Sequence, residues 1–156
     1  MRAKKSLGQN FLMHARIAER IALTAKLSPD AVVFEIGPGT GMLTRELLSA
    51  VGGSASGGKV IALEADRGLF ETLQVEFAHE IAEGTLELMH GDIRTFDASA
   101  LPRQYVLVAN IPYYLTGEIL RLFLETTNQP SAMTLLVQKE VAERIVGNPE
   151  RSRGVR

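Results

Sequence analysis

The chain has 156 residues, of which 46% are hydrophobic and 22% are charged, and its formal net charge is −1. This is an ordinary globular composition, and the near-neutral charge excludes a uniformly basic nucleic-acid-binding protein. There is no cysteine, so disulfides and thiolate ligands are excluded, and the three histidines are too scattered to suggest a metal site. Because no apolar run approaches the roughly 20 residues that cross a bilayer, we expect one cytoplasmic domain over residues 1–156 and no membrane contact.

Strands and helices are expected to alternate along the chain. Short apolar runs predict five strands, at residues 32–36, 59–64, 85–90, 105–109 and 132–137. Helical spacing of apolar residues predicts five helices, at 15–26, 42–50, 67–81, 116–126 and 139–146. We expect Thr116 to cap its helix and the glycine-rich residues 52–58 to form a flexible connection. Since parallel neighbours need helix-length connections, this order predicts an α/β fold, with a mostly parallel sheet and helices on both faces.

The first predicted strand is followed by a glycine-rich turn, E-I-G-P-G-T-G at residues 35–41. Glycines allow positive φ and let a ligand approach the backbone at the start of a helix, and ligands of such sheets bind at the carboxyl ends of the strands. The spacing differs from the G-x-G-x-x-G of dinucleotide folds, because Met42 stands where the third glycine would fall, and the turn lacks the lysine of a P-loop. Alone, the turn is equally compatible with a tight turn and with a ligand site.

Two acidic residues come at the ends of the next two strands. Glu64 lies 23 residues after Gly41, close to the roughly 20-residue offset at which an acid reaches a ribose. Asp66 competes for this role, although it is also placed to cap the following helix. Asp92 could accept a hydrogen bond from an exocyclic amine or could be a simple turn residue. Taken together, the glycine turn and the two acids predict an adenosine pocket without a phosphate cradle.

The fourth strand runs into N-I-P-Y at residues 110–113. A proline there cannot extend the strand ladder, and tyrosines at the mouth of a strand must pack or stack, so the motif could simply be a strand-terminating turn. It resembles the catalytic N-P-P-Y motif of S-adenosylmethionine-dependent methyltransferases that act on nucleobase amino groups. With K-K-S-L-G-Q-N-F-L at 4–12 and L-L-V-Q-K-E-V-A-E-R-I at 135–145, the chain resembles the N-terminal portion of ribosomal RNA adenine dimethyltransferases over residues 4–146.

This resemblance implies a Rossmann-like methyltransferase fold and S-adenosylmethionine as the cofactor. The substrate would be the N6 amines of two adjacent adenosines near the 3′ end of small-subunit ribosomal RNA, in an immature ribosomal subunit. The histidine and cysteine content predicts no metal, and the sequence leaves the oligomeric state open, with a monomer favoured. The cofactor contacts implied by similarity are Asn10, Leu12, Gly37, Glu64, Asp92 and Asn110.

The same resemblance makes the turn of the fourth strand the catalytic segment. The side-chain oxygen of Asn110 and the carbonyl of Ile111 would accept the N–H bonds of the adenine amine, while Pro112 fixes the turn. Tyr113 would stack on the target base, which must be unpaired or flipped out of its helix. We assign Tyr114 to packing.

Alternatives and a departure from the family stay open. Family members continue into further strands and a small helical domain, so we expect an incomplete methyltransferase domain whose fifth strand is an exposed edge. The erythromycin-resistance methylases of large-subunit ribosomal RNA share Q-N-F-L and N-I-P-Y, although residues 135–145 favour the small-subunit enzyme. A non-catalytic ribosome assembly factor is a further alternative. A nicotinamide-dependent dehydrogenase fits the element order but not the glycine spacing.

Overall fold

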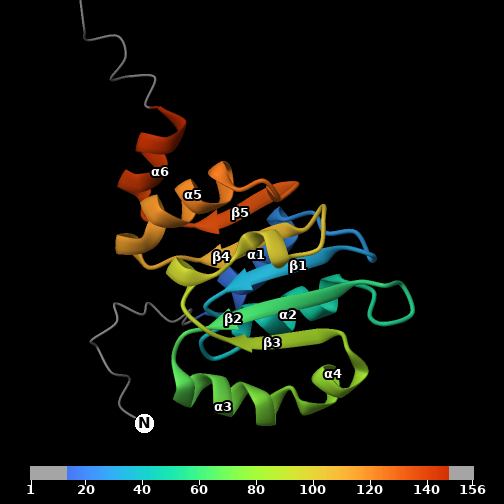
Figure 1. Ribbon diagram of the computed structural model, residues 1–156. Helices are drawn as coiled ribbons and strands as arrows, with labels where there is room; N and C mark the ends of the chain where they lie inside the picture. Colours follow the sequence, from blue (N-terminus) through green and yellow to red (C-terminus); the bar gives the residue numbers. More distant parts are fainter. Residues whose placement is uncertain (1–13, 148–156) are drawn as a thin grey trace, which may run out of the picture.

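Five parallel strands form a single sheet in the computed structural model, which describes residues 14–147 (Figure 1). The strands are β1 (Val32–Ile36), β2 (Lys59–Glu64), β3 (Leu86–His90), β4 (Val106–Asn110) and β5 (Ala132–Leu136). Their order across the sheet is β3-β2-β1-β4-β5, and every neighbouring pair is parallel. The predicted α/β class is therefore confirmed, and β5 is an edge of the described sheet, as expected.

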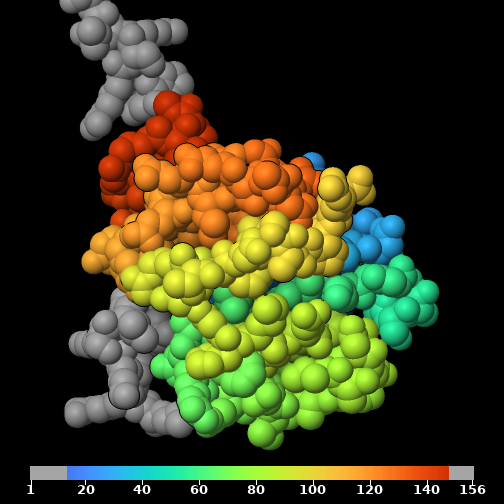
Figure 2. Space-filling view, viewed as in Figure 1, coloured from blue at the N-terminus to red at the C-terminus, as the bar shows by residue number. Residues whose placement is uncertain are grey.

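Helices cover both faces of the sheet, with α1 and α2 behind it and α5 in front in Figure 1. The helices are α1 (Ala15–Thr24), α2 (Met42–Ala50), α3 (Arg67–Glu76), α4 (Ala78–Glu83), α5 (Thr116–Glu125) and α6 (Lys139–Val146), and short 3₁₀ turns cover Ile93–Thr95, Ala98–Ala100 and Tyr113–Leu115. The space-filling view in Figure 2 shows that the segment between β3 and β4 lies across the front face, beside α5. Within residues 14–147, no helix is long and apolar enough to cross a membrane.

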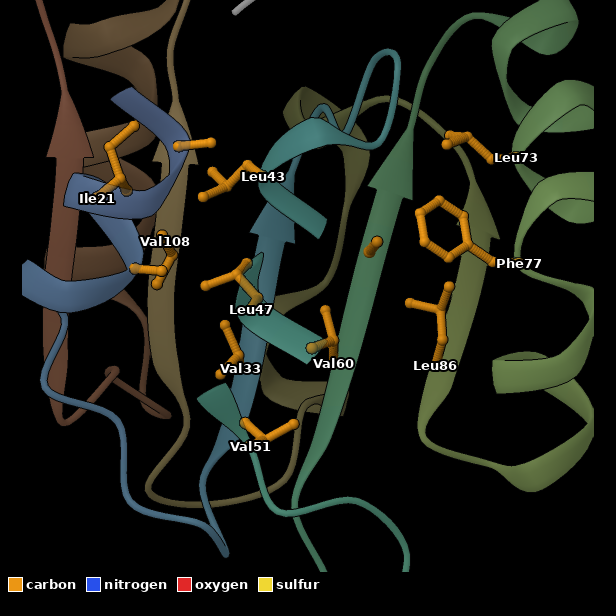
Figure 3. Close-up of a cluster of buried hydrophobic side chains, with 13 residues drawn as sticks. Ile21, Val33, Leu43, Leu47, Val51, Val60, Leu73, Phe77, Leu86 and Val108 are labelled. Carbon is orange, nitrogen blue, oxygen red and sulfur yellow. The ribbon is translucent and has the colours of Figure 1, made fainter. Parts of the chain in front are cut away.

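Two apolar clusters hold the layers together, one on each face of the sheet. Behind it, Val33 and Leu47 are buried with the aromatic ring of Phe77, as Figure 3 shows. In front, Phe34 is buried against Phe123 of α5. Adjacent residues of β1 thus enter opposite clusters, as the two-residue period of a strand requires. Because both faces are buried, the strand reads as a continuous apolar run interrupted by a single acid.

The carboxyl ends of the central strands meet at the point where the strand order reverses. From β1 the chain builds β2 and β3 on one side, and then returns to build β4 and β5 on the other. Ile36, at the end of β1, is paired with Leu63 of β2 and Ala109 of β4. The segments that follow β1, β2 and β4 therefore begin side by side. Ligands of open α/β sheets bind at such a switch point.

The predicted helix over residues 67–81 is wrong in one respect, because it is broken at Phe77. Helix α3 ends at Glu76, α4 begins at Ala78, and Phe77 between them has φ −105° and ψ 26°. Its ring is buried in the rear cluster, where a Cβ added at Gly41 would lie 2.6 Å from a ring carbon. The break thus coincides with close packing of this ring against the glycine turn, a contact that helical periodicity does not encode.

Two local expectations also need correction. Thr116 does not cap α5: it is the first helical residue, and its buried hydroxyl has no partner among the described residues. Residues 52–58 form an ordered, hydrogen-bonded turn rather than the flexible connection that was expected. The backbone N–H of Gly52 and the hydroxyl of Ser56 both donate to the carbonyl of Pro29, at 2.7 and 2.9 Å. Pro29 therefore fixes the path into β2.

Candidate functional site

A cavity of about 310 Å³ opens at the carboxyl ends of the central strands. Its walls come from the segments that follow β1, β2, β3 and β4, and its size falls in the usual range for a small-molecule site. The predicted site residues that line it are Gly37, Glu64, Asp92, Asn110 and Pro112. Ile111 and Tyr113 are not among the lining residues, and the predicted contacts Asn10 and Leu12 lie outside the described residues.

The glycine turn supplies one wall of the cavity. Gly37 and Gly41 have φ of 67° and 81°, a region that side chains other than glycine rarely adopt. A Cβ added at Gly37 would meet nothing within 4 Å, so its backbone faces open space. At Gly41 the same addition would collide with Phe77. The first glycine thus leaves room for a ligand, whereas the last one leaves room for the core.

Glu64 is the last residue of β2, and its side chain is only 2% exposed. One carboxylate oxygen accepts the backbone N–H of Gly39 at 2.9 Å, and the other accepts that of Asp66 at 2.8 Å. These bonds fix the carboxylate between the glycine turn and the start of α3. Asp66 caps α3 by accepting the N–H of Leu69 at 2.9 Å, as its structural interpretation predicts, and does not line the cavity.

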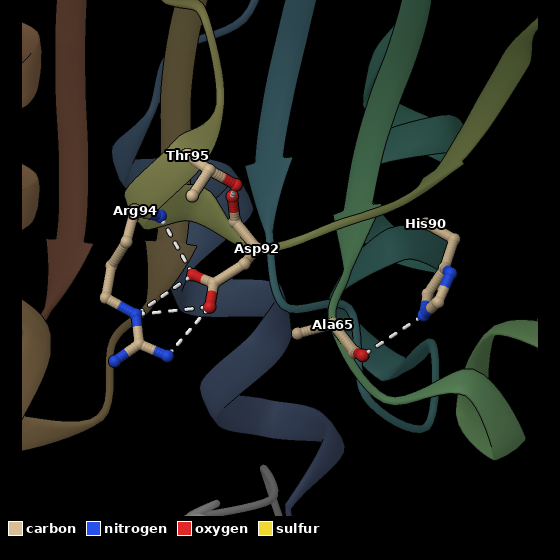
Figure 4. A network of polar contacts seen from close by, with 5 residues as sticks. All are labelled: Ala65, His90, Asp92, Arg94 and Thr95. Carbon is tan, nitrogen blue, oxygen red and sulfur yellow. Dashed lines mark hydrogen bonds and ion pairs between the residues drawn. The ribbon is translucent and has the colours of Figure 1, made fainter.

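Asp92 follows β3 and is held by Arg94 (Figure 4). The guanidinium donates to both carboxylate oxygens, at 2.7 to 3.1 Å, and the backbone N–H of Arg94 donates to one of them at 2.9 Å. The Arg94 side chain, followed by its backbone N–H, lowers the pKa of Asp92 below its ordinary value. Asp92 is therefore an ionised acceptor at the wall of the cavity. Arg94 also lines the cavity, and the sequence motifs gave no signal for it.

The end of β4 brings the N-I-P-Y segment to the opposite wall. Asn110 is the last residue of the strand, and the buried Ile111 donates its backbone N–H to the carbonyl of Leu136 at 3.2 Å. Pro112 follows in extended geometry, with φ −56° and ψ 136°. The pairing to β5 thus continues one residue past the strand and fixes the direction of the turn.

The two tyrosines after Pro112 are placed differently with respect to the cavity. Tyr113 is 58% exposed, and its ring meets that of Tyr114 edge-on, with the centroids 5.7 Å apart. Tyr114 packs against Tyr113, as assigned, but it is 45% exposed and also lines the cavity, which the assignment to packing missed. The cause is the 3₁₀ turn over Tyr113–Leu115, which directs consecutive side chains to different sides.

A buried acid to which the motifs assigned no role lies two residues before Gly37. Glu35 of β1 is 1% exposed, and one of its carboxylate oxygens accepts the hydroxyl of Thr44 at 2.7 Å. The other oxygen has no partner among the described residues. Burial raises the pKa of Glu35 to about 8, the Thr44 bond opposes this shift, and the charge of Glu64 adds to it. The signal in the sequence was a single acid inside an apolar strand.

Two solved methyltransferases share this fold over most of the chain. The 23S rRNA methyltransferase ErmE matches with a TM-score of 0.73 and 31% identity, covering 88% of this chain and 52% of its own. A dimethyladenosine transferase from Plasmodium falciparum matches with a TM-score of 0.73 and 28% identity, covering 90% and 48%. The parallel sheet with its covering helices is thus that of a Rossmann-like S-adenosylmethionine-dependent methyltransferase.

Comparison of sequences gives the family within this class. The family model of the ribosomal RNA adenine dimethylases matches residues 1–156, and the chain belongs to this family. The ribosomal RNA small subunit methyltransferase A of Dehalococcoides mccartyi is 42% identical over 149 residues, which are 94% of this chain and 48% of that protein. The chain therefore spans about half the length of the curated relatives it matches.

The lining of the cavity fits S-adenosylmethionine, the cofactor of this class. The open backbone at Gly37 admits a ligand close to the turn, and the carboxylates of Glu64 and Asp92 are hydrogen-bond acceptors for hydroxyl and amine groups. The carboxylate of Glu64 also complements a cationic sulfonium, whereas the charge of Asp92 is balanced by Arg94. Among the described residues, no group of three or more acidic or histidine side chains could hold a metal ion.

Proposed function

We propose that the chain forms the cofactor-binding part of an S-adenosylmethionine-dependent rRNA (adenine-N6,N6)-dimethyltransferase. Its substrate is two adjacent adenosines near the 3′ end of small-subunit ribosomal RNA in an immature ribosomal subunit. The observation that carries the proposal is the convergence of Glu64, Asp92 and Asn110, from the carboxyl ends of three different strands, on one cavity beside the open backbone of Gly37. The name of the Dehalococcoides mccartyi relative supports the choice of the small subunit.

On this proposal, each wall of the cavity holds one part of the cofactor. Glu64 accepts the ribose hydroxyls, because its carboxylate is already oriented by the backbone N–H groups of Gly39 and Asp66. Asp92 accepts the adenine amine, and Gly37 lies against the methionine portion. Asn10 and Leu12 are further cofactor contacts in the proposal. When bound, S-adenosylmethionine supplies an electrophilic methyl group.

The segment after β4 then holds the target amine. The lone pair of an adenine amine is delocalised into the ring, which makes the nitrogen a poor nucleophile. Asn110 and the carbonyl of Ile111 accept its two N–H bonds and so favour a pyramidal, more reactive nitrogen. Pro112 aims that carbonyl, because its ring fixes φ. Holding the nitrogen in line with the methyl group, at about 3 Å, lowers the activation barrier by several kcal/mol. After transfer, the surplus proton of the nitrogen passes to solvent.

Tyr113 provides the stacking surface for the target base. Its ring is more exposed than any other aromatic ring near the cavity, and its edge-on contact with Tyr114 limits its orientations. Stacking on an aromatic side chain contributes roughly 1–3 kcal/mol per base. The adenosine must be unpaired or flipped out of its helix to reach this ring.

The alternative with structural support is a methylase of the erythromycin-resistance type. The ErmE structure matches the fold with 31% identity. Against it stand the curated relatives named for the small subunit, which are 40–42% identical to this chain. A non-catalytic assembly factor would bind ribosomal subunits by the same surface without transferring a methyl group.

Methyl transfer to ribosomal RNA tests the proposal. Labelled S-adenosylmethionine and the full-length protein are incubated with small subunits that lack the modification, and separately with large-subunit RNA, and the labelled base is mapped. We expect label on two adjacent adenosines near the 3′ end of the small-subunit RNA. Label on large-subunit RNA alone would favour the erythromycin-resistance type, and binding without label would favour the assembly factor.

A further inference from the structure

Glu35 and Glu64 are the only buried acids among the described residues, and they lie on adjacent strands. Both precede segments that line the cavity, but only Glu64 reaches it. The side chain of Glu35 lies on the rear face of β1, where it meets Thr44 of α2. Glu35 therefore cannot contact the cofactor, and its burial calls for a different structural explanation.

The hydrogen-bond donors around the two acids differ. Glu64 accepts two backbone N–H groups, one at each oxygen, and these donors can stabilise a negative charge. Glu35 accepts a single hydroxyl from Thr44, and its second oxygen accepts nothing from the described residues. A buried, ionised carboxylate with one donor is costly, and a like charge nearby raises this cost further. The surroundings of Glu35 therefore favour its neutral form.

The groups that face Glu35 from neighbouring elements do not offset a charge. Its partners in the sheet are Ala62 of β2 and Val108 of β4, both apolar. The buried residues of the helices on the same face are Ala18, Ile21 and Ala22 of α1 and Leu43, Thr44 and Leu47 of α2. The charged residues of α1 and α2 are all exposed or half-buried: Arg16, Glu19, Arg20, Arg45 and Glu46. The charge on Glu64 is the one that acts on Glu35.

We propose that Glu35 is a neutral carboxylic acid and a positioning residue for the glycine turn. Through Thr44 it joins the end of β1 to the first turn of α2, and these two points bracket residues 37–41. Within this turn, the backbone N–H of Gly39 donates to Glu64. Loss of the proton from Glu35 would place a second negative charge beside Glu64 in an apolar layer, where the single Thr44 donor does not offset it, and this repulsion would disturb the glycine turn. The proposal rests on the proposed function only for the identity of the ligand used below.

The protonation state is measured directly by a pH titration of the full chain without ligand. The side-chain carboxyl groups of glutamate are labelled with ¹³C, and the Glu35 resonance is assigned by its loss in Glu35→Gln. We expect its titration midpoint near 8, far above the ordinary value of 4.5. A midpoint at or below the ordinary value would overturn the proposal, whatever the protein binds.

The positioning role is measured by calorimetry with S-adenosylhomocysteine. Because glutamine imitates a neutral acid, we expect Glu35→Gln to bind within about twofold of wild type at pH 7, and Glu35→Ala to bind about tenfold more weakly. Above pH 8 the wild-type affinity should fall while that of Glu35→Gln stays level. Equal losses in Glu35→Gln and Glu35→Ala would overturn the proposal, since the site would then need the charge.

Variants of Thr44 give a second test that leaves Glu35 in place. Thr44→Ser keeps the hydroxyl donor and should bind as wild type does, whereas Thr44→Val removes it at nearly constant shape and should weaken binding. Equal affinity of both variants for S-adenosylhomocysteine would show that the Thr44–Glu35 hydrogen bond does not position the glycine turn. If wild type binds no S-adenosylhomocysteine at all, the proposed function fails, while the titration still decides the state of Glu35.

Discussion

The carboxylate of Glu64 accepts the backbone N–H of Gly39 at 2.9 Å, so the end of β2 is joined to the glycine turn that follows β1. This bond connects two walls of the cavity that are 25 residues apart in the chain. A ligand that engages the carboxylate therefore also meets the turn in a fixed geometry.

Glu64→Gln should weaken the binding of S-adenosylhomocysteine by about tenfold or more, equivalent to at least about 1.4 kcal/mol. The amide group of glutamine cannot accept both the N–H of Gly39 and that of Asp66, and it cannot accept two ribose hydroxyls. Calorimetry at constant pH gives the affinity.

The matched control is Asp66→Ala, which removes the cap of α3. It should lower the free energy of unfolding by about 1 kcal/mol and change affinity much less. If Asp66→Ala weakened binding more than Glu64→Gln, the acid that faces the ribose would have been assigned wrongly.

Asp92 and Arg94 should behave differently when changed, although they form one ion pair. Asp92→Ala removes the acceptor at the cavity wall, and we expect a loss of about tenfold in affinity for S-adenosylhomocysteine. Arg94→Ala should barely change Tm, because exposed ion pairs contribute little to stability.

Arg94→Ala also gives a pH signature. Without its guanidinium the pKa of Asp92 should rise, so that affinity falls off at a higher pH than in wild type as the solution is acidified. Affinities measured from neutral to acidic pH test this, and superimposable profiles for the two proteins would show that Arg94 does not control the charge of Asp92.

Gly41→Ala should destabilise the protein by about 1–3 kcal/mol, because the added Cβ collides with the buried ring of Phe77. Denaturant unfolding measures the change. Gly53→Ala is the matched control, since its φ of 72° is similar but nothing lies within 4 Å of the added atom. A Gly41→Ala variant no less stable than Gly53→Ala would mean that the ring does not pack against the turn.

The stability of wild type relative to Glu35→Gln should depend on pH. In the folded protein the pKa of Glu35 is raised to about 8, whereas in the unfolded chain it is near 4.5. The folded state thus retains a proton that the unfolded state releases, so wild-type stability should decrease relative to Glu35→Gln as pH rises between these values, and level off above pH 8. Thermal unfolding across this range provides the measurement, and a constant difference in Tm would contradict it.

The strands and the placement of the main site residues follow from local patterns. Apolar runs predict β1 to β5, and the end of a parallel strand fixes the edge of the sheet to which Glu64, Asp92 and Asn110 belong. The glycine turn is predictable because a positive φ at Gly37 excludes most other residues. These features depend on a few neighbouring residues and on the rules of parallel sheets.

Features that depend on distant contacts could not be predicted in this way. The break at Phe77 reflects packing against Gly41, and the ordered turn at 52–58 depends on Pro29. The placement of Tyr114 against the cavity depends on the short 3₁₀ turn after Pro112. The first two features depend on a contact with a residue that is distant in the sequence. The third depends on a short turn whose geometry leaves no periodic pattern in the sequence.

The most direct test of the catalytic account is single-turnover methyl transfer by the Asn110→Ala variant of the full-length protein, with Tm and affinity for S-adenosylhomocysteine measured on the same sample. On the proposed mechanism Asn110→Ala removes the side-chain oxygen that accepts from the target amine, so we predict that transfer falls at least about 100-fold while the protein stays folded and binds the ligand. Transfer at the wild-type rate in that folded, ligand-binding variant would contradict the account.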